Sequence, residues 1–581
     1  MGRTAAILLT TLSFIFLPRY AGACTTTLVT AGATVDGSLY VTHSDDNELM
    51  DERVIFVPAM DHDPGSERPV YCSATALGPM PEYNAVLEPR LFCEERGPGY
   101  MQAMGAELYI PLGSIPQVEH TYSYFDGSYG IMNEHQVMIG ECTNSARWQL
   151  PADPEKRLFY SSELSRVALE RCTTAREAVE LMGWLVEEYG YYGTGETLPV
   201  GDPQEGWIFE VCCGTADSSG GLWVARRVPD GTVFVAANEF RIREIDPDDP
   251  DLLYCSDLFE QTEALGWWDP ADGPLDWLTT VAEGECRHPY DALRRVWRIQ
   301  SLVAPSLELS PWVEDGNTHY YPFSVTPDTL LSTRGVMRLH RDHFEGTEFD
   351  MTVGPAAGPF GYPNRHYGEY DDHGFIGGET STDQPGAWER PISAGYVGFV
   401  YVCQGRDWLP DPVGGICWMG PDKPAETCFV PFYCGMNDLP WSYQSGDTRI
   451  FSRESAWWAF NFVSNWAELK YSYMIKDIQA VQDSVENAEL ADVALVDAAA
   501  MEIMEEDECG ARAYLTNWSI ANADTVVDRW WSLADMLIVR YDDGYVNSPD
   551  EMAVEVGYPQ WWLDEVGYSD GPVGYGATEG Y

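Results

Sequence analysis

Residues 1–23 have the three-part pattern of a secretory leader, and this pattern decides which residue begins the chain that folds. A basic start, Met1-Gly2-Arg3, precedes an apolar run from Ala5 to Leu17 and an A-x-A cleavage signature, Ala21-Gly22-Ala23. The run is shorter than the ~20 residues that a membrane helix needs, and no later segment qualifies. We therefore expect a signal peptide over 1–23, no membrane span, and a secreted or periplasmic chain that signal peptidase cuts before Cys24.

The composition indicates a globular protein with a strongly acidic surface. The 581 residues are 45% hydrophobic and 13% aromatic, and 34 basic against 92 acidic residues give a formal charge of −58. Such a chain is too apolar to be disordered, and its charge repels nucleic acid and anionic membranes. The acidity fits either a high-salt habitat or an ordinary secreted protein. An oligomer is compatible with the sequence, which does not set the oligomeric state.

The cysteine content suits the oxidising compartment that a leader implies. Setting Cys24 aside leaves 14 − 1 = 13 cysteines, an odd number, so at least one further thiol is unpaired or pairs between chains. There is no C-x-x-C pair, and the spacings among Cys403, Cys417, Cys428 and Cys434 match no zinc pattern. We expect several structural disulfides rather than a metal site.

Alternating apolar residues predict strands in the first half of the chain, and helical periodicity follows later. The strands are expected at 24–30 and 38–42, around the turn Asp36-Gly37, and in a meander of 207–213, 222–228 and 232–237 whose last pair is joined by 229–231. Thr174 and Glu177 form a capping box that opens a helix ending near Glu188. Residues 455–500 and 525–539 are also predicted to be helical. Strands and helices mixed along one chain predict a layered α+β protein.

A cysteine directly after a cleavage site has three interpretations: a disulfide partner, the lipidated residue of a lipoprotein, or a nucleophile that uses its own α-amino group. Arg19, Tyr20 and Ala21 do not fit a lipidation signal. A thiol with a pKa of about 8.5 needs a base near neutral pH, and a free α-amine with a pKa of about 7.7–8.0 is suitable. That nitrogen is an amide until the leader is removed. The local sequence leaves the three interpretations open.

Ordered blocks along the mature chain resemble the dipeptidase A family. These enzymes are cysteine N-terminal-nucleophile (Ntn) hydrolases related to secernins and, more distantly, to bile-salt and penicillin V acylases. The blocks are at 24–29, 33–38, 43–46, 130–134, 139–141, 202–207, 223–231, 237–238, 343–350, 389–393, 455–458 and 557–563. The resemblance implies one four-layer αββα Ntn-hydrolase domain over 24–581, in which about 490–581 form an additional helical C-terminal elaboration.

The resemblance also assigns roles by position. Cys24 would be the nucleophile through its thiol and the general base through its α-amine. Asp46 would orient the cysteine, Asn238 would stabilise the tetrahedral oxyanion, and Arg390 would support Asp46 or the cysteine. His43 stands where the family commonly has arginine, which changes the charge expected there. Thr143 or Asn144 would supply a second oxyanion contact.

The activity expected from this resemblance is the hydrolysis of dipeptides through a Cys24 thioester. Asp45 and Glu141 are candidates for binding the substrate ammonium group. No metal or organic cofactor is expected, and His340-Arg341-Asp342-His343 lacks the spacing of a helical zinc pair. The alternatives are an N-acyl amide hydrolase like the bile-salt and penicillin acylases, and a non-catalytic, disulfide-rich or lipidated secreted binding protein.

Overall fold

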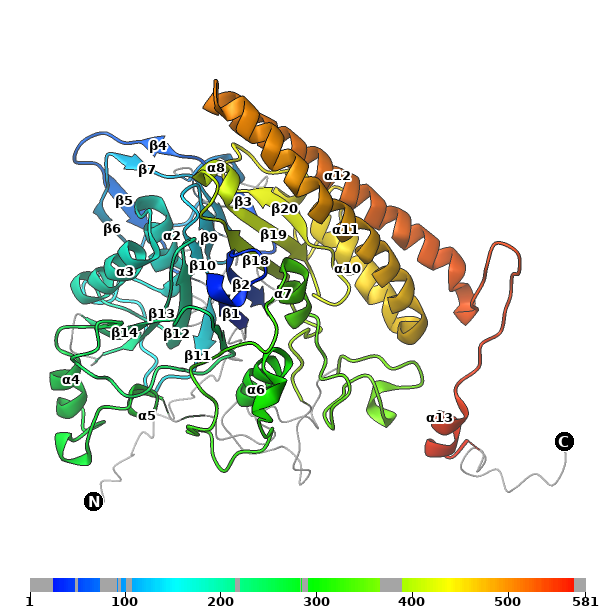
Figure 1. Cartoon of the computed structure of the whole chain (residues 1–581), viewed down its shortest axis with the longest axis horizontal. Helices are drawn as coiled ribbons and strands as arrows, with labels where there is room; N and C mark the ends of the chain where they lie inside the picture. Colours follow the sequence, from blue (N-terminus) through cyan, green and yellow to red (C-terminus); the bar gives the residue numbers. More distant parts are fainter. Residues whose placement is uncertain are drawn as a thin grey trace, which may run out of the picture.

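The computed structural model describes residues 24–46, 51–73, 91, 93, 96–100, 107–214, 220–282, 284, 291–365 and 389–568. The predicted signal peptide therefore lies outside the described residues. Two antiparallel sheets lie face to face, and helices cover the outer face of each (Figure 1). The predicted α+β class is confirmed.

The first sheet contains the N-terminal strand at its centre. Its order is β17 (Ser324–Val325), β15 (Val233–Ala236), β1 (Thr25–Val29), β2 (Leu39–Asp45), β18 (Phe399–Gly405), β19 (Ile416–Pro421) and β20 (Val430–Tyr433). The predicted β1–β2 hairpin is confirmed, and Thr26 lies opposite His43 in it. Gly37 has a φ of 85° in the turn, a conformation that glycine adopts without strain.

The second sheet is formed by strands that follow in the chain. Its order is β16 (Leu252–Tyr254), β14 (Gly221–Arg227), β13 (Gly206–Cys213), β12 (Gly195–Gly201), β10 (Met138–Ile139), β9 (Gly130–Asn133), β8 (Tyr124–Asp126) and β3 (Ile55–Val57), with β11 (Cys142–Asn144) also paired to β12. Two small pairs join β4 (Met60–Asp61) to β7 (His120–Thr121) and β5 (Glu67–Val70) to β6 (Gly113–Pro116).

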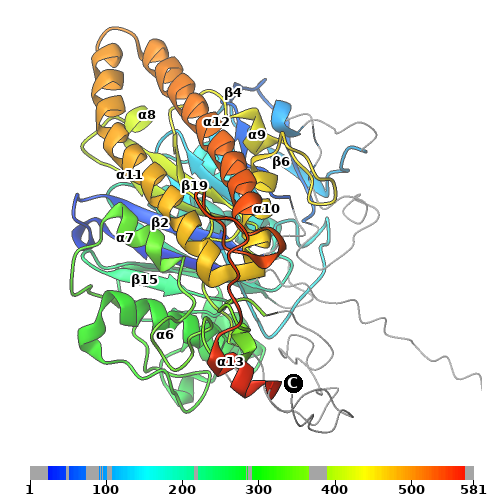
Figure 2. The ribbon, with the colours of Figure 1, turned by 90° about the vertical axis from the view of Figure 1, so that its right-hand side faces the viewer.

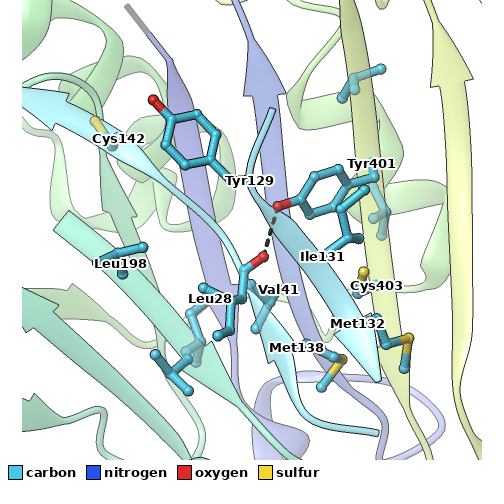
Figure 3. Packing of buried hydrophobic residues seen from close by; sticks show 14 of the residues in the cluster. Leu28, Val41, Tyr129, Ile131, Met132, Met138, Cys142, Leu198, Tyr401 and Cys403 are labelled. Carbon is cyan, nitrogen blue, oxygen red and sulfur yellow. Dashed lines mark hydrogen bonds between the residues drawn. The ribbon is translucent and has the colours of Figure 1, made fainter. Parts of the chain in front are cut away.

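Apolar side chains from both sheets fill the space between them. Leu28 and Val41 of the first sheet lie near Met138 and Leu198 of the second (Figure 3). The backbones approach so closely that a Cβ on Gly140 would lie 2.6 Å from Thr26 Oγ1. Glycine between β10 and β11 thus makes room for β1 and β2, and this close packing holds the first sheet against the second.

The predicted meander is wrong in its last strand. β13 pairs with β14, but β15 pairs with β1 in the other sheet. Residues 229–231 therefore connect the two sheets, and Asp230 Oδ1 accepts a hydrogen bond from Gly32 N at 2.8 Å. An apolar strand satisfies its period-2 pattern equally well in either sheet, so the sequence pattern does not tell the two apart.

Helices α2 (Ser161–Arg171) and α3 (Ala175–Tyr189) cover the second sheet. The predicted start of α3 is confirmed, because Thr174 Oγ1 accepts a hydrogen bond from Glu177 N at 3.2 Å. The first sheet is covered by α6 (Asp291–Val303), α7 (Thr333–Leu339), α10 (Ala456–Ala467), α11 (Tyr471–Met504) and α12 (Glu508–Arg540). Figure 2 shows α10, α11 and α12 in front of β2 and β19. Short helices are α4 (Leu258–Ala264), α5 (Trp277–Val281), α8 (Asp411–Gly414), α9 (Trp441–Gln444) and α13 (Gln560–Glu565).

The helical prediction for the last third needs two corrections. The region predicted at 455–500 is divided into α10 and α11, because Lys470 has a non-helical backbone (φ −156°, ψ 57°). The helix predicted at 525–539 begins earlier, at Glu508. The prediction missed residues 508–524 because their buried side chains include small ones, such as Ala511, Ser519 and Ala523, which give a weak apolar pattern. Among the described residues, no helix is both long and apolar enough to cross a bilayer.

The predicted structural disulfides are wrong for most of the described cysteines. Free thiols are found at Cys24, Cys142, Cys172, Cys212, Cys213, Cys255, Cys403, Cys417, Cys428, Cys434 and Cys509. Of these, all but Cys509 are buried, and Cys403 lies opposite Cys417 on neighbouring strands without forming a disulfide with it. Free cysteine packs as a small hydrophobic residue, so counting cysteines does not distinguish core thiols from disulfides.

Several arginines are buried against carboxylates rather than exposed. Glu163 accepts hydrogen bonds from Arg68 at 2.7 Å, from Arg96 at 2.6 Å and from Arg166 at 3.1 Å. Burial alone would raise the pKa of Glu163, but the three guanidinium groups hold it well below its usual range. These groups are therefore charged in the folded protein, and their charges are neutralised inside it.

Candidate active site

Cys24 lies immediately before β1, in the space between the two sheets. Its neighbours on the same strand face, Thr26 and Leu28, point toward the second sheet, and alternation along a strand gives Cys24 the same direction. The side chain is 1% exposed. The carbonyl oxygen of Cys24 accepts a hydrogen bond from Arg295 Nη1 at 3.0 Å. The thiol is therefore held at a defined place in the interior.

Three carboxylates make the surroundings of this thiol anionic. Burial raises the pKa of Cys24 well above its usual range, and Glu141, Asp45 and Asp46 raise it further. Burial also raises the pKa of Asp45, to about 7. It raises that of Asp46 to about 6, against the lowering effect of Arg390 and Arg295. The site therefore disfavours a free thiolate and favours any positive charge that enters it.

His43 lies on β2, on the strand face that carries Asp45. Its Nδ1 lies 2.8 Å from the carbonyl oxygen of Glu141. Burial lowers the pKa of His43, although Glu141 opposes this effect. His43 therefore does not supply the positive charge that an arginine would bring to this position. One ligand atom each of Cys24, His43 and Asp45 lie within 4.8 Å of one another.

Asn238 follows β15 and has a left-handed backbone, with φ 67°. Its Oδ1 accepts hydrogen bonds from Arg295 Nη2 at 2.7 Å and from Arg390 Nη1 at 3.4 Å. Because guanidinium groups only donate, the amide nitrogen must face the other way, and it donates to the carbonyl oxygen of Thr143 at 2.7 Å. An amide nitrogen has two hydrogens, and only this one hydrogen bond of it is seen among the described residues, so the second N–H can act as a donor.

The remaining predicted residues lie around this centre, and all of them are within the described residues. Arg390 forms an ion pair with Asp46. Thr143 Oγ1 donates to Glu141 Oε1 at 2.8 Å, and the backbone nitrogen of Asn238 donates to the Cys142 thiol at 2.6 Å. Asn144 is directed elsewhere, because its amide donates to Thr197 Oγ1 at 2.6 Å. The structure thus brings together all of the predicted side chains except that of Asn144.

Arg295 on α6 is the residue that the sequence analysis missed. It is fully buried, and its guanidinium group joins Cys24 and Asn238. A signal was present in the sequence, because Arg295 shares the helix face of Ala292, Val296 and Ile299, which is otherwise apolar. A cation within an apolar stripe indicates a buried partner or a site.

Comparisons with known proteins show similarity to peptidases. The model of peptidase family C69 matches residues 110–484, which is more than half of the chain and begins after Cys24. A probable dipeptidase of Salmonella dublin is 26% identical over 337 residues, or 57% of this chain and 68% of the relative. A probable dipeptidase of Latilactobacillus sakei is 24% identical over 75% of this chain and 79% of its own. Dipeptidase A of Lactobacillus helveticus is 21% identical over 77% of this chain and 82% of its own.

Proposed function

Because this chain belongs to peptidase family C69, we propose that it is a dipeptidase whose nucleophile is Cys24. The family expected from the sequence motifs is confirmed, and the chain is a peptidase. The observation that carries the proposal is the arrangement at the start of β1, where Cys24 and the amide of Asn238 are held by one guanidinium group, that of Arg295.

The electrostatics of the site explain why the nucleophile needs its own amine. Burial and three carboxylates raise the pKa of Cys24, so a preformed thiolate is a minor species. Once 1–23 are removed, the α-amine of Cys24 accepts the thiol proton as sulfur attacks the scissile carbonyl. The carboxylates stabilise the ammonium group that results. The same ammonium then protonates the leaving amine, and water releases the acyl group from the thioester.

Asn238 is placed to stabilise the oxyanion. Its amide is oriented before the reaction by Arg295 and Arg390, so no reorganisation is needed when negative charge develops on the substrate oxygen. A donor of this kind lowers the barrier by about 3–4 kcal/mol. Thr143 contributes through its carbonyl oxygen, which holds the Asn238 amide in this orientation.

The carboxylates also indicate which substrates the site prefers. The free α-ammonium group of a dipeptide is attracted to Asp45 and Glu141, whereas a fatty-acyl, bile-salt or penicillin-like amide offers no such cation. These side chains are 3% and 0% exposed, so solvent screens the attraction weakly. The anionic site therefore supports dipeptides over N-acyl amides.

The proposal extends to the fold and to maturation. Two facing antiparallel sheets between helical layers support the four-layer Ntn-hydrolase fold. One continuous core that runs from Leu28 to Tyr541 supports a single domain over 24–581. The leader pattern of 1–23 supports cleavage by signal peptidase and a secreted or periplasmic enzyme, which cleavage would activate.

The test uses the secreted protein in a Cys509→Ser background, because Cys509 is exposed and would also react with iodoacetamide. We expect N-terminal sequencing to begin at Cys24, one alkylation at that residue, and parallel loss of Ala-Ala hydrolysis. Cys24→Ser should be inactive, with an unchanged circular dichroism spectrum. N-acetyl-Ala-Ala should show kcat/KM roughly 10- to 100-fold lower, from the loss of a charged contact of about 1.5–3 kcal/mol. An active protein with a blocked Cys24 or another first residue would overturn the proposal.

A further inference from the structure

The side chains of Cys24, His43 and Asp45 form a compact set of potential metal ligands. His43 and Asp45 alternate along β2 and so share one strand face, and Cys24 precedes the neighbouring strand β1 on that same face. One ligand atom of each residue lies within 4.8 Å of the others, and all three residues are buried. The β1–β2 hairpin itself therefore fixes a sulfur, a nitrogen and an oxygen close together.

Two of these residues have unused acceptor atoms. The carbonyl oxygen of Glu141 only accepts hydrogen bonds, so Nδ1 of His43 carries the hydrogen and Nε2 carries the lone pair. Among the described residues, His43 Nε2 and Asp45 Oδ2 have no hydrogen-bond partner within 3.5 Å, although the Ser128 hydroxyl interacts with the Asp45 carboxylate. Buried polar atoms of this kind normally have partners, so two of them in one cluster indicate a ligand.

The charge of the cluster suits a cation. Glu141 and Asp46 add negative charge around the three ligand residues, and Arg390 forms an ion pair with Asp46. Cysteine sulfur, histidine nitrogen and carboxylate oxygen are the usual protein ligands of Zn²⁺, which prefers four of them in a tetrahedron. In a chain that begins at Cys24, the α-amine is a fourth donor, because an amine and a thiolate of one cysteine chelate one ion.

We propose that Cys24, His43 and Asp45 bind Zn²⁺ and that this binding reversibly inhibits the enzyme. This inference rests on the proposed function, because the ion takes the nucleophile and the base of the reaction. The Cys24 thiol loses its proton to solvent when the Zn–S bond forms, and no electron is transferred. The proposed site is therefore regulatory.

The other cluster of this kind in the described part of the chain differs in one respect. Glu244, Asp276 and His319 also approach within 4.8 Å. The guanidinium group of Arg243 already contacts this cluster, with Nη2 2.6 Å from Asp276 Oδ2. A cation is therefore already in place, and His319→Asn is the matched control.

The test measures metal binding directly, with Co²⁺ as the spectroscopic probe and Zn²⁺ as its competitor. Mature protein should give one thiolate-to-cobalt charge-transfer band with visible bands of tetrahedral intensity, and one equivalent of Zn²⁺ should abolish them. The charge-transfer band should be lost in Cys24→Ser and after alkylation. His43→Gln and Asp45→Asn should weaken Zn²⁺ binding at least 10-fold, while His319→Asn leaves it unchanged. Zn²⁺ should inhibit Ala-Ala hydrolysis, and a chelator should restore it.

The outcomes separate this inference from the proposed function. A cobalt spectrum that is insensitive to His43→Gln, or Zn²⁺ binding that only His319→Asn removes, would refute the site. Dipeptide hydrolysis without stoichiometric Zn²⁺ binding would refute this inference and leave the proposed function standing. A chain that binds Co²⁺ through Cys24 and His43 but hydrolyses no dipeptide would refute the proposed function and the inhibition, and would leave only the metal site established.

Discussion

Replacing Arg295 by lysine tests whether one buried guanidinium group holds the catalytic centre together. Arg295 donates to Cys24 O at 3.0 Å and to Thr25 Oγ1 at 2.9 Å through Nη1, and to Asn238 Oδ1 at 2.7 Å through Nη2. A lysine ammonium keeps the charge but lacks the planar fork that reaches both sides. The Oδ1 atom of Asn238 would then keep only the contact with Arg390, at 3.4 Å, which is too long for a strong hydrogen bond. The hydrogen bond from the Asn238 amide nitrogen to the Thr143 carbonyl oxygen would remain, but it fixes only one end of the amide.

The expected magnitude follows from these contacts. If the Asn238 amide is no longer oriented, the barrier rises by most of one oxyanion-hole donor, or about 2.7 kcal/mol. This corresponds to a decrease of about 100-fold in kcat. The KM should change little, because the substrate ammonium group is bound by carboxylates that Arg295→Lys leaves in place. Arg295 thus acts as a positioning residue, and its signature is the separation of kcat from KM.

The assay is steady-state hydrolysis of Ala-Ala alongside thermal unfolding. Arg294→Lys is the matched control, because Arg294 is equally buried but contacts Pro311, Glu389 and the Phe349 ring. Both substitutions should lower Tm, and Arg295→Lys alone should lower kcat strongly. The reasoning is refuted if folded Arg295→Lys keeps kcat within about threefold of the wild type, or if Arg294→Lys loses as much.

Three further predictions concern single positions. Burial raises the pKa of Glu210 from about 4.5 to about 7, so this group should lower the free energy of unfolding of the wild type by about 3 kcal/mol as pH rises through that interval. In urea unfolding, Glu210→Gln should show a smaller decrease in this free energy between pH 4 and pH 8 than the wild type does. An equal decrease in the two proteins would contradict the assignment. Gly140→Ala should destabilise the protein by about 1–3 kcal/mol, because the new Cβ would lie 2.6 Å from Thr26 Oγ1; an unchanged Tm would mean that the sheets are less closely packed than described. Asn238→Asp replaces an amide donor by an acceptor facing the Thr143 carbonyl oxygen and should lower kcat about 10²–10³-fold; wild-type kcat in this variant would exclude Asn238 from the oxyanion site.

The parts of the fold that the sequence predicts are those with local signals. The turn at Asp36-Gly37 and the alternation on either side of it specify the β1–β2 hairpin, and the Thr174 cap specifies where α3 begins. The sheet to which β15 belongs was not predictable, because it depends on whether residues 229–231 fold back or cross over. The first half of α12 was also not predicted, because its small buried residues give no apolar pattern and their burial depends on packing against residues distant in the sequence.

The candidate site shows the same division. The leader pattern singles out Cys24 as a candidate nucleophile, and the resemblance to the dipeptidase A family supports that role. The same resemblance predicts His43, Asp46, Asn238 and Arg390. Arg295 belongs to none of the blocks that carry this resemblance, and a single arginine in a helix is usually taken as a surface residue. Its role depends on α6 lying beside β15, which is a tertiary contact. Physical reasoning from sequence therefore identifies the reacting group more easily than the groups that hold it in place.

The buried arginines have a consequence for the protein's relation to its medium. With 34 basic residues in total and guanidinium groups such as those of Arg68, Arg96, Arg166, Arg295 and Arg390 in the interior, few side-chain cations remain to alternate with the surface carboxylates. The exterior is therefore a polyanion whose counter-ions are supplied by the solution. The range of repulsion between its charges is the Debye length, about 10 Å at 0.1 M salt and about 3 Å at 1 M. Dissolved cations therefore stabilise the folded protein by screening its surface carboxylates, and lowering the salt concentration weakens this stabilisation.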